Sequence, residues 1–149
     1  MKTTKKTKLF LYSIFLITVI PTIIVYIQHG LVEGEASLKA KTETKHIKTF
    51  AEGLLFVVIG VGYIVLTGLM FLFPKNRIPY LVLIVGTVAV VILYYFRIYG
   101  IPVPFTNGIV ITDLSSDWRD VITKICQQIM VVPTTGLLMM RKSISTTNH

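Results

Sequence analysis

Residues 9–27 read LFLYSIFLITVIPTIIVYI, a run of 19 residues that carries no charge. As an α-helix this run is roughly 28 Å long, close to the ~30 Å thickness of the hydrocarbon layer of a bilayer. The lysines that precede it also resemble the start of a signal peptide, but the apolar run is longer than a signal peptide requires and no small residues follow it closely. We therefore expect an uncleaved helix that spans a membrane.

Three further runs of similar length follow, at residues 51–73, 80–96 and 117–140. Pro74 ends the first of these, because proline cannot continue a helix. Only the six residues 74–79 connect it to the next run, so the two helices must be antiparallel neighbours. The sequence thus predicts an all-α integral membrane protein, with four transmembrane helices in a single membrane domain over residues 1–149.

The composition agrees with this fold class. Of the 149 residues, 53% are apolar and 15% are charged, and the mean hydropathy is +0.72. A soluble domain carries roughly a quarter charged residues because water wets its surface. The composition therefore excludes a soluble globular enzyme and a disordered chain, and the single cysteine excludes a disulfide-stapled secreted domain. Nucleic acid is not an expected partner, because the net charge of +8 is explained by basic residues in the tail and loops that flank the membrane spans.

The fourth run differs from the others because polar residues recur along it. Asp117, Asp120, Lys124 and Gln127 are three or four residues apart, which places them on one side of a helix that is amphipathic at its start. A helix lying in the membrane surface is the alternative, but it needs a polar face along its whole length. We interpret this stripe, with Gln128, as a face for contact with other helices, and in second place as the wall of a pore.

Basic residues predict the orientation, because they collect on the cytoplasmic side. With four spans, the side of the termini carries eight of them: Lys2, Lys5, Lys6, Lys8, Lys75, Arg77, Arg141 and Lys142. The other side carries six: Lys39, Lys41, Lys45, Lys48, Arg97 and Arg119. We therefore expect a protein of the cell membrane with both termini in the cytoplasm. Tyr94, Tyr95 and Tyr99 beside Arg97 are typical of an anchor at the outer membrane interface.

Two outer segments are long enough to have structure of their own. Residues 28–50 contain many good helix formers and no proline, so we expect a basic loop that is helical in part. In residues 100–116, Asn107 and Gly108 suit a type I′ turn between β-favouring residues. This pattern predicts a short β-hairpin-like loop, which must pack on the helix ends or on another chain because two strands alone are unstable.

Two pairs of residues have the spacing of metal ligands. His29 and Glu33 are four residues apart, as are Cys126 and Met130, so one helical turn can present either pair to a metal. A polar boundary at the end of a span explains the first pair more simply, and a buried thiol beside a flexible core residue explains the second. We therefore expect no metal at either pair, no other cofactor and no catalytic residue.

These features favour a non-catalytic accessory or assembly subunit of a larger membrane complex, with the lipid bilayer and other membrane subunits as its partners. Its format resembles that of small multi-pass subunits of respiratory or oxidase/monooxygenase complexes, although no motif supports the likeness. One alternative is a small transporter or channel subunit that acts as a homo-oligomer, with Lys124, Gln127 and Gln128 along the path. Another is a membrane protein that binds metal at one of the two pairs.

Overall fold

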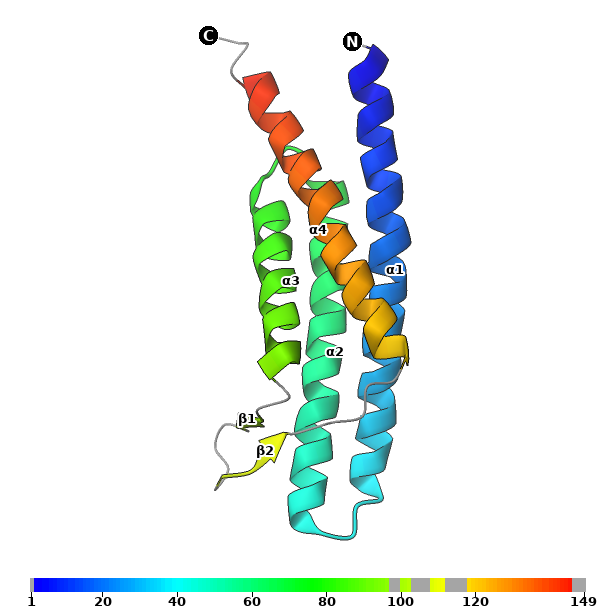
Figure 1. Ribbon diagram of the computed structural model, residues 1–149, viewed down its shortest axis with the longest axis vertical. Coiled ribbons are helices and arrows are strands. Elements are labelled where there is room, and N and C mark those ends of the chain that lie inside the picture. Colours follow the sequence, from blue (N-terminus) through cyan, green and yellow to red (C-terminus); the bar gives the residue numbers. More distant parts are fainter. Residues whose placement is uncertain (1, 97–99, 103–107, 112–117, 146–149) are drawn as a thin grey trace.

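The computed structural model of the protein describes residues 2–96, 100–102, 108–111 and 118–145. Within these ranges the chain forms four helices: α1 (Lys2–Leu38), α2 (Glu43–Leu72), α3 (Ile78–Phe96) and α4 (Trp118–Ser145). They pack as a bundle in which α1 begins and α4 ends at the same end (Figure 1). Each helix is long and apolar enough to cross a membrane. The predicted all-α membrane protein with four spans is confirmed at this level.

Helix α1 is almost twice as long as predicted, because it continues from Lys2 to Leu38 rather than stopping at residue 27. Pro21 lies inside it, which a transmembrane helix tolerates when its surroundings satisfy the freed carbonyl. Gly30 does not end the helix, and most of the residues that follow are good helix formers. The thickness of the bilayer therefore determines how long the apolar part of α1 is, but not the residue at which the helix ends.

The predicted outer loop over residues 28–50 is mostly helix. Helix α2 begins at Glu43, so residues 39–42 alone connect it to α1. The two helices form a long antiparallel pair whose turn lies beyond the end of α3 (Figure 1). The expectation of partial helix was correct in kind, but the helical part is larger than predicted.

Helices α1 and α2 approach each other closely where Gly53 of α2 meets Gly30 and Gly34 of α1. A Cβ atom on Gly53 would lie 2.9 Å from the backbone oxygen of Gly30 and 3.0 Å from the backbone nitrogen of Gly34. Because backbone atoms cannot move aside as a side chain can, a residue without Cβ is needed here. Gly30 and Gly34 have the GxxxG spacing of closely packed membrane helices. The sequence analysis placed Gly30 and Gly34 outside the four spanning runs, in a loop that it expected to be helical only in part, and so it did not predict this contact.

The other two helices fit their predicted ranges more closely. Helix α3 begins at Ile78 instead of residue 80, and α4 runs on to Ser145 instead of ending at residue 140. Helix α4 remains continuous through Pro133 and crosses the bundle in contact with α1 and α3 (Figure 1). Asp117, the predicted first residue of this helix, lies outside the described residues.

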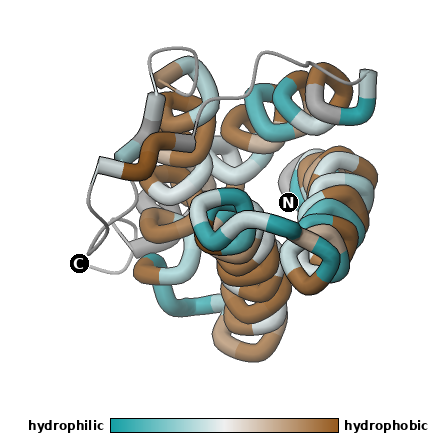
Figure 2. Tube along the Cα trace, turned by 90° about the horizontal axis from the view of Figure 1, so that it is seen from below, coloured by the Kyte–Doolittle hydropathy of each residue, from teal (hydrophilic) through white to brown (hydrophobic). Residues whose placement is uncertain are grey.

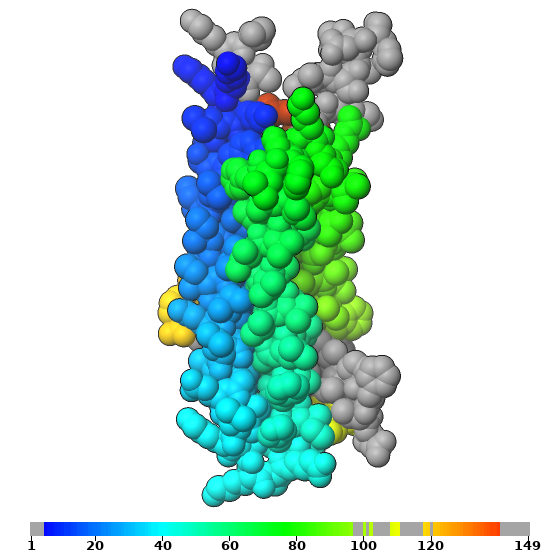
Figure 3. All heavy atoms as spheres, turned by 180° about the vertical axis from the view of Figure 1, so that it is seen from behind, coloured from blue at the N-terminus to red at the C-terminus, as the bar shows by residue number. Residues whose placement is uncertain are grey.

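Apolar side chains both fill the interior and cover the outside. The fully buried side chains include Phe15 of α1, Met70 of α2, Tyr80 of α3 and Met130 of α4. Many leucine, isoleucine and valine side chains on the outward faces are exposed, and Figure 2 shows hydrophobic residues on these faces. Figure 3 shows α1, α2 and α3 side by side on one such face. An apolar exterior of this kind belongs in a lipid bilayer.

The predicted β-hairpin loop is not supported. Strands β1 (Ile101–Pro102) and β2 (Val110–Ile111) pair antiparallel over only two residues each. Gly108 has a φ of +80°, which glycine adopts readily, but Asn107 lies outside the described residues. Because a proline cannot donate to the ladder and the pair is so short, this contact does not form a hairpin of its own.

Candidate functional site

Tyrosines mark two levels along the bundle. The hydroxyls of Tyr12 on α1 and Tyr80 on α3 are hydrogen-bonded at 2.9 Å. At the second level, the ring centroids of Tyr26 on α1 and Tyr94 on α3 lie 5.2 and 4.6 Å from the Nζ atom of Lys124. The two tyrosines of each helix are 14 residues apart, which corresponds to roughly 21 Å in both helices. The levels in α1 and α3 therefore coincide.

These levels place the bundle relative to the membrane. Helix α3 has 19 residues, roughly 28 Å, which is the length that the hydrocarbon layer requires. Because Tyr80 and Tyr94 lie near its two ends, we place the two levels near the two membrane surfaces. Thr87 lies midway between these tyrosines and hence near the middle of the bilayer. Leu38 lies 12 residues beyond Tyr26, so the end of α1 extends roughly 18 Å past the second level.

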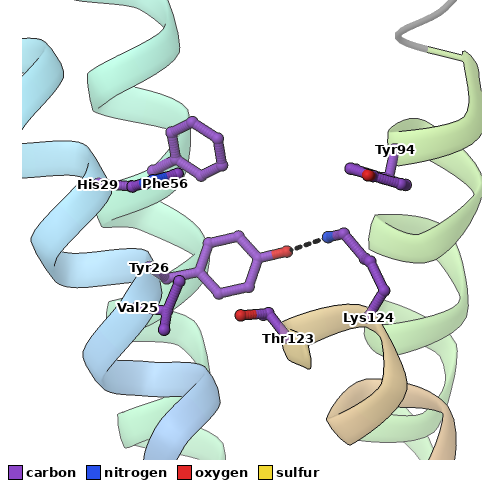
Figure 4. A pocket seen from close by; sticks show the side chains of 7 residues that line it. All are labelled: Val25, Tyr26, His29, Phe56, Tyr94, Thr123 and Lys124. Carbon is purple, nitrogen blue, oxygen red and sulfur yellow. Dashed lines mark hydrogen bonds between the residues drawn. The ribbon is translucent and has the colours of Figure 1, made fainter. Parts of the chain in front are cut away.

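Lys124 on α4 reaches across the bundle toward α1 near the second level. Its Nζ atom donates a hydrogen bond to the hydroxyl of Tyr26 at 2.6 Å (Figure 4). It donates a second one to Oε1 of Gln127 at 3.2 Å. The rings of Tyr26 and Tyr94 also face this ammonium. The negative face of an aromatic ring attracts a cation, and more strongly where water is excluded. Three helices therefore hold the charge of Lys124.

Gln127 is fully buried and connects Lys124 to the centre of the bundle. Its Nε2 atom donates to the hydroxyl of Tyr26 at 3.0 Å and to that of Tyr63 at 3.1 Å. Tyr63 donates to Oγ1 of Thr87 at 3.1 Å, and Thr87 donates to the backbone oxygen of Leu83 at 2.7 Å. The hydrogen bonds thus run without a break from α4 through α1 and α2 to α3.

We refer to Tyr26, Tyr63, Thr87, Lys124 and Gln127 as the central network. A polar group without a partner in hydrocarbon costs several kcal/mol, because no water can replace the missing hydrogen bond. Hydrogen bonds between membrane helices are individually worth only about 0.6 to 2 kcal/mol. The network therefore specifies which helix faces meet more than it adds to stability.

A small cavity lies beside the network, and all four helices contribute side chains to it. Its volume is about 10 Å³, room for about one water molecule. Its walls are made by Val25, Tyr26, His29, Phe56, Tyr94, Thr123 and Lys124. Figure 4 shows the Lys124 ammonium group between Tyr26 and Tyr94. This cavity is too small to hold an organic substrate.

The structure separates the residues of the predicted polar stripe. Gln127 is buried, whereas Gln128 is exposed on the outside of α4. Asp117 lies outside the described residues, and Asp120 lies in the first turn of α4. Within the stripe, Lys124 and Gln127 are hydrogen-bonded to Tyr26 of α1 and Tyr63 of α2 in the same chain, and contact of the stripe with another subunit stays a prediction.

The sequence analysis did not predict the hydrogen-bond partners of Lys124 and Gln127. Tyr26, Tyr63 and Thr87 are polar residues inside otherwise apolar runs, and this is the signal that marks them. Of the predicted interfacial anchors, Tyr94 contacts the ring of Tyr95 at 5.8 Å between centroids. Arg97 and Tyr99 lie outside the described residues.

The two candidate metal pairs have different surroundings. His29 packs edge-on against the ring of Phe56 at 5.4 Å between centroids, and Glu33 lies beside Gly53. Cys126 is half-buried, whereas Met130 is fully buried in the core. No group of three histidine, cysteine, aspartate or glutamate residues gathers in the described part of the chain.

Fold and site together define a four-helix membrane bundle that is tied together by a buried polar network. No known protein family, characterised protein or solved structure matches this chain. Its function must therefore be argued from its own residues.

Two adjacent amides provide a matched test of the central network. Gln127→Leu removes the bridge between Tyr26 and Tyr63, so we expect the free energy of unfolding in detergent to fall by about 1–3 kcal/mol. Gln128→Leu changes an exposed side chain, and its effect should stay within about 0.5 kcal/mol. Equal losses in thermal or denaturant unfolding would show that the network does not hold the helices together.

Proposed function

We propose that the protein is a non-catalytic accessory or assembly subunit of a larger membrane complex, such as a respiratory or an oxidase/monooxygenase complex. A groove between α2 and α3 that opens toward the bilayer carries this proposal. The central network already uses Lys124 and Gln127 inside the chain, so the groove replaces the polar stripe as the surface for a partner helix.

The groove is apolar and has a volume of about 140 Å³. It is lined by Ile59, Gly62, Tyr63, Leu66, Leu83, Gly86, Thr87 and Val90. No atom lies within 4 Å of where a Cβ on Gly62 or Gly86 would be, so each glycine leaves space on the outside of its helix. The groove therefore lies open where the two helices face the lipid.

Two glycines facing one groove indicate a helix as its occupant. A glycine inside a helix costs about 1 kcal/mol relative to alanine. Close approach of another backbone offsets this cost in membrane proteins, where small residues are enriched at helix contacts. Gly30 and Gly53 already serve such a contact within the chain. We infer that Gly62 and Gly86 serve the same purpose for a helix of a partner subunit.

Filling the groove should release the partner. For the double variant Gly62→Leu and Gly86→Leu, we expect at least a tenfold loss of stoichiometric partner in native co-purification from mild detergent. Gly68→Leu is the matched control, because Gly68 also lies in α2 with open space around it but does not line the groove. Both the double variant and the Gly68→Leu control should retain the thermal stability of the wild type.

The accessory function is wrong if wild-type protein from native membranes carries no stoichiometric partner. The groove is the wrong surface if a partner is present and the double variant retains it. These two results separate the function from the surface that we assign to it.

We also propose that the protein lies in the cell membrane and that both of its termini are in the cytoplasm. Helix α1 begins and α4 ends at one end of the bundle, and Lys75 and Arg77 lie between α2 and α3 at that same end (Figure 1). Basic residues in short loops determine orientation most reliably. The loop over residues 100–116 would then lie on the outer side of the membrane.

Cysteine labelling tests the orientation. In a Cys126→Ala background, a membrane-impermeant maleimide should label Lys41→Cys on intact cells and Lys75→Cys only after permeabilisation. The reverse pattern would place the termini outside.

A transporter or channel that works as a homo-oligomer is the second candidate. The central network favours it, because polar groups extend from Lys124 near one surface level to Thr87 at mid-depth. Intramembrane ionisable residues commonly mark ion or proton paths. In a channel of this kind, proteoliposome flux of protons or small cations should be lost in Gln127→Leu and kept in Gln128→Leu. Flux that neither substitution changes would exclude a path along the network.

A further inference from the structure

The segments at the end of the bundle where α1 begins and α4 ends carry basic residues and no acidic ones. Residues 1–8, 74–79 and 141–149 contain eight lysines and arginines, whereas all seven aspartates and glutamates lie between residues 33 and 120. The rest of the chain contains seven basic residues as well, so the net charge of +8 arises entirely from these three segments. The orientation of a membrane protein requires an excess of lysine and arginine on one side, but it does not require that acidic residues be excluded there.

An aromatic contact brings two of these segments together. The hydroxyl of Tyr12 on α1 is hydrogen-bonded to that of Tyr80 in the first turn of α3. The ring of Tyr12 also lies 5.5 Å, between centroids, from the ring of Phe71 in the last turn of α2. The start of α1 is therefore a neighbour of the connection between α2 and α3, as Figure 3 also shows.

Three exposed basic residues flank this contact, namely Lys8, Lys75 and Arg77. Lys8 lies one helical turn before Tyr12, and its Nζ atom is 6.0 Å from the centroid of the Tyr12 ring. Lys75 and Arg77 belong to the connection between α2 and α3, in which a backbone hydrogen bond of 3.0 Å closes a turn. The fold thus holds three positive charges at one place on the end of the bundle.

The depth of these charges matches that of lipid headgroups. Lys8 lies four residues, or roughly 6 Å, beyond Tyr12 toward the end of the bundle. Arg77 lies three residues before Tyr80, at the start of α3. Tyr12 and Tyr80 mark one of the two levels that we place near the membrane surfaces, and the headgroup layer extends about 5–7 Å beyond the hydrocarbon on each side.

Large apolar side chains adjoin the three basic residues in the chain. Leu9 follows Lys8, Phe73 precedes the connection and Ile78 follows Arg77, and all three of these apolar side chains are exposed. A soluble anion or an acidic protein surface would match the charges but would leave the apolar side chains uncovered. A molecule with a negative head and apolar chains matches both.

We propose that Lys8, Lys75 and Arg77 bind the phosphate of an anionic phospholipid, whose acyl chains cover the apolar side chains beside them. Ammonium and guanidinium groups form charge-assisted hydrogen bonds with phosphate oxygens, and a guanidinium can bind two oxygens at once. The site shares no residue with the groove between α2 and α3. The proposal therefore does not rest on the accessory function.

Native mass spectrometry of the full chain in a non-ionic detergent tests the site. Phosphatidylglycerol and phosphatidylcholine with identical acyl chains are the two probes. The wild type should bind phosphatidylglycerol with at least roughly tenfold higher affinity, because each basic residue near the membrane surface favours anionic lipid. The triple variant Lys8→Gln, Lys75→Gln and Arg77→Gln should reduce this preference to about threefold or less.

A matched control removes three exposed cations from the other end of the bundle. The variant Lys39→Gln, Lys41→Gln and Lys45→Gln should keep the preference of the wild type. The double variant Lys8→Arg and Lys75→Arg retains the charges and should keep it as well. Without added lipid, all of these variants should melt at the temperature of the wild type, so a change in lipid binding would not reflect a loss of folding.

Several results would overturn the proposal. One is a wild type with equal affinity for the two lipids, and another is a control variant that loses as much preference as the triple variant. Displacement of phosphatidylglycerol by glycerol phosphate, which has no acyl chains, would assign the three residues to a soluble phosphate. A triple variant that keeps its lipid preference but loses a co-purifying subunit would assign them to an acidic protein.

Discussion

The arrangement of the four helices depends on one constraint, which is that the amide of Gln127 must be hydrogen-bonded inside a bilayer. Apolar helix faces do not select one another in lipid, because the acyl chains are as apolar as leucine. Gln127 meets its constraint only where Tyr26 of α1 and Tyr63 of α2 come together. This bridge fixes the rotation of α4 against both helices, and Thr87 extends the same selection to α3.

Lys124 adds a constraint of depth to this constraint of rotation. Its ammonium bonds Tyr26 and faces the ring of Tyr94, both at the second level. Aromatic side chains with polar tips prefer the membrane interface, and a lysine near it loses less hydration than one at mid-depth. The charge therefore sits where the least hydration is lost, while its neighbour Gln127 reaches inward to the centre. One turn of α4 sets both how deep the helix lies and which way it faces.

Hydropathy predicted the four spans because the thickness of the bilayer dictates how long an apolar run must be. Hydropathy did not predict where the helices end, because the local sequence, and not the membrane surface, determines where a helix ends. Residues 28–50 were therefore expected to be a loop that is helical only in part, whereas α1 continues through Gly30 to Leu38. Lys124 and Gln127 are recognisable as polar residues in an apolar run, but their partners are distant in the sequence. Tyr26 lies 98 residues from Lys124, and Tyr63 lies 64 residues from Gln127. Only the packing of α4 distinguishes Gln127 from Gln128.

The glycines of the bundle show how this packing divides inner from outer surfaces. Gly30 and Gly53 meet inside the chain, where a Cβ atom on Gly53 would touch backbone. Gly62 and Gly86 face open space, although each costs its helix as much stability as an inner glycine. A similar contrast holds for leucine, because Leu83 is buried in the core whereas Leu31 and Leu38 of α1 are exposed. The network satisfies much of the polar interior within a single chain, although the buried Oγ1 atom of Thr67 has no hydrogen-bond partner. The two glycines without a neighbour, by contrast, lie on the outside. We therefore expect the function of this bundle to be carried out through its helix surfaces.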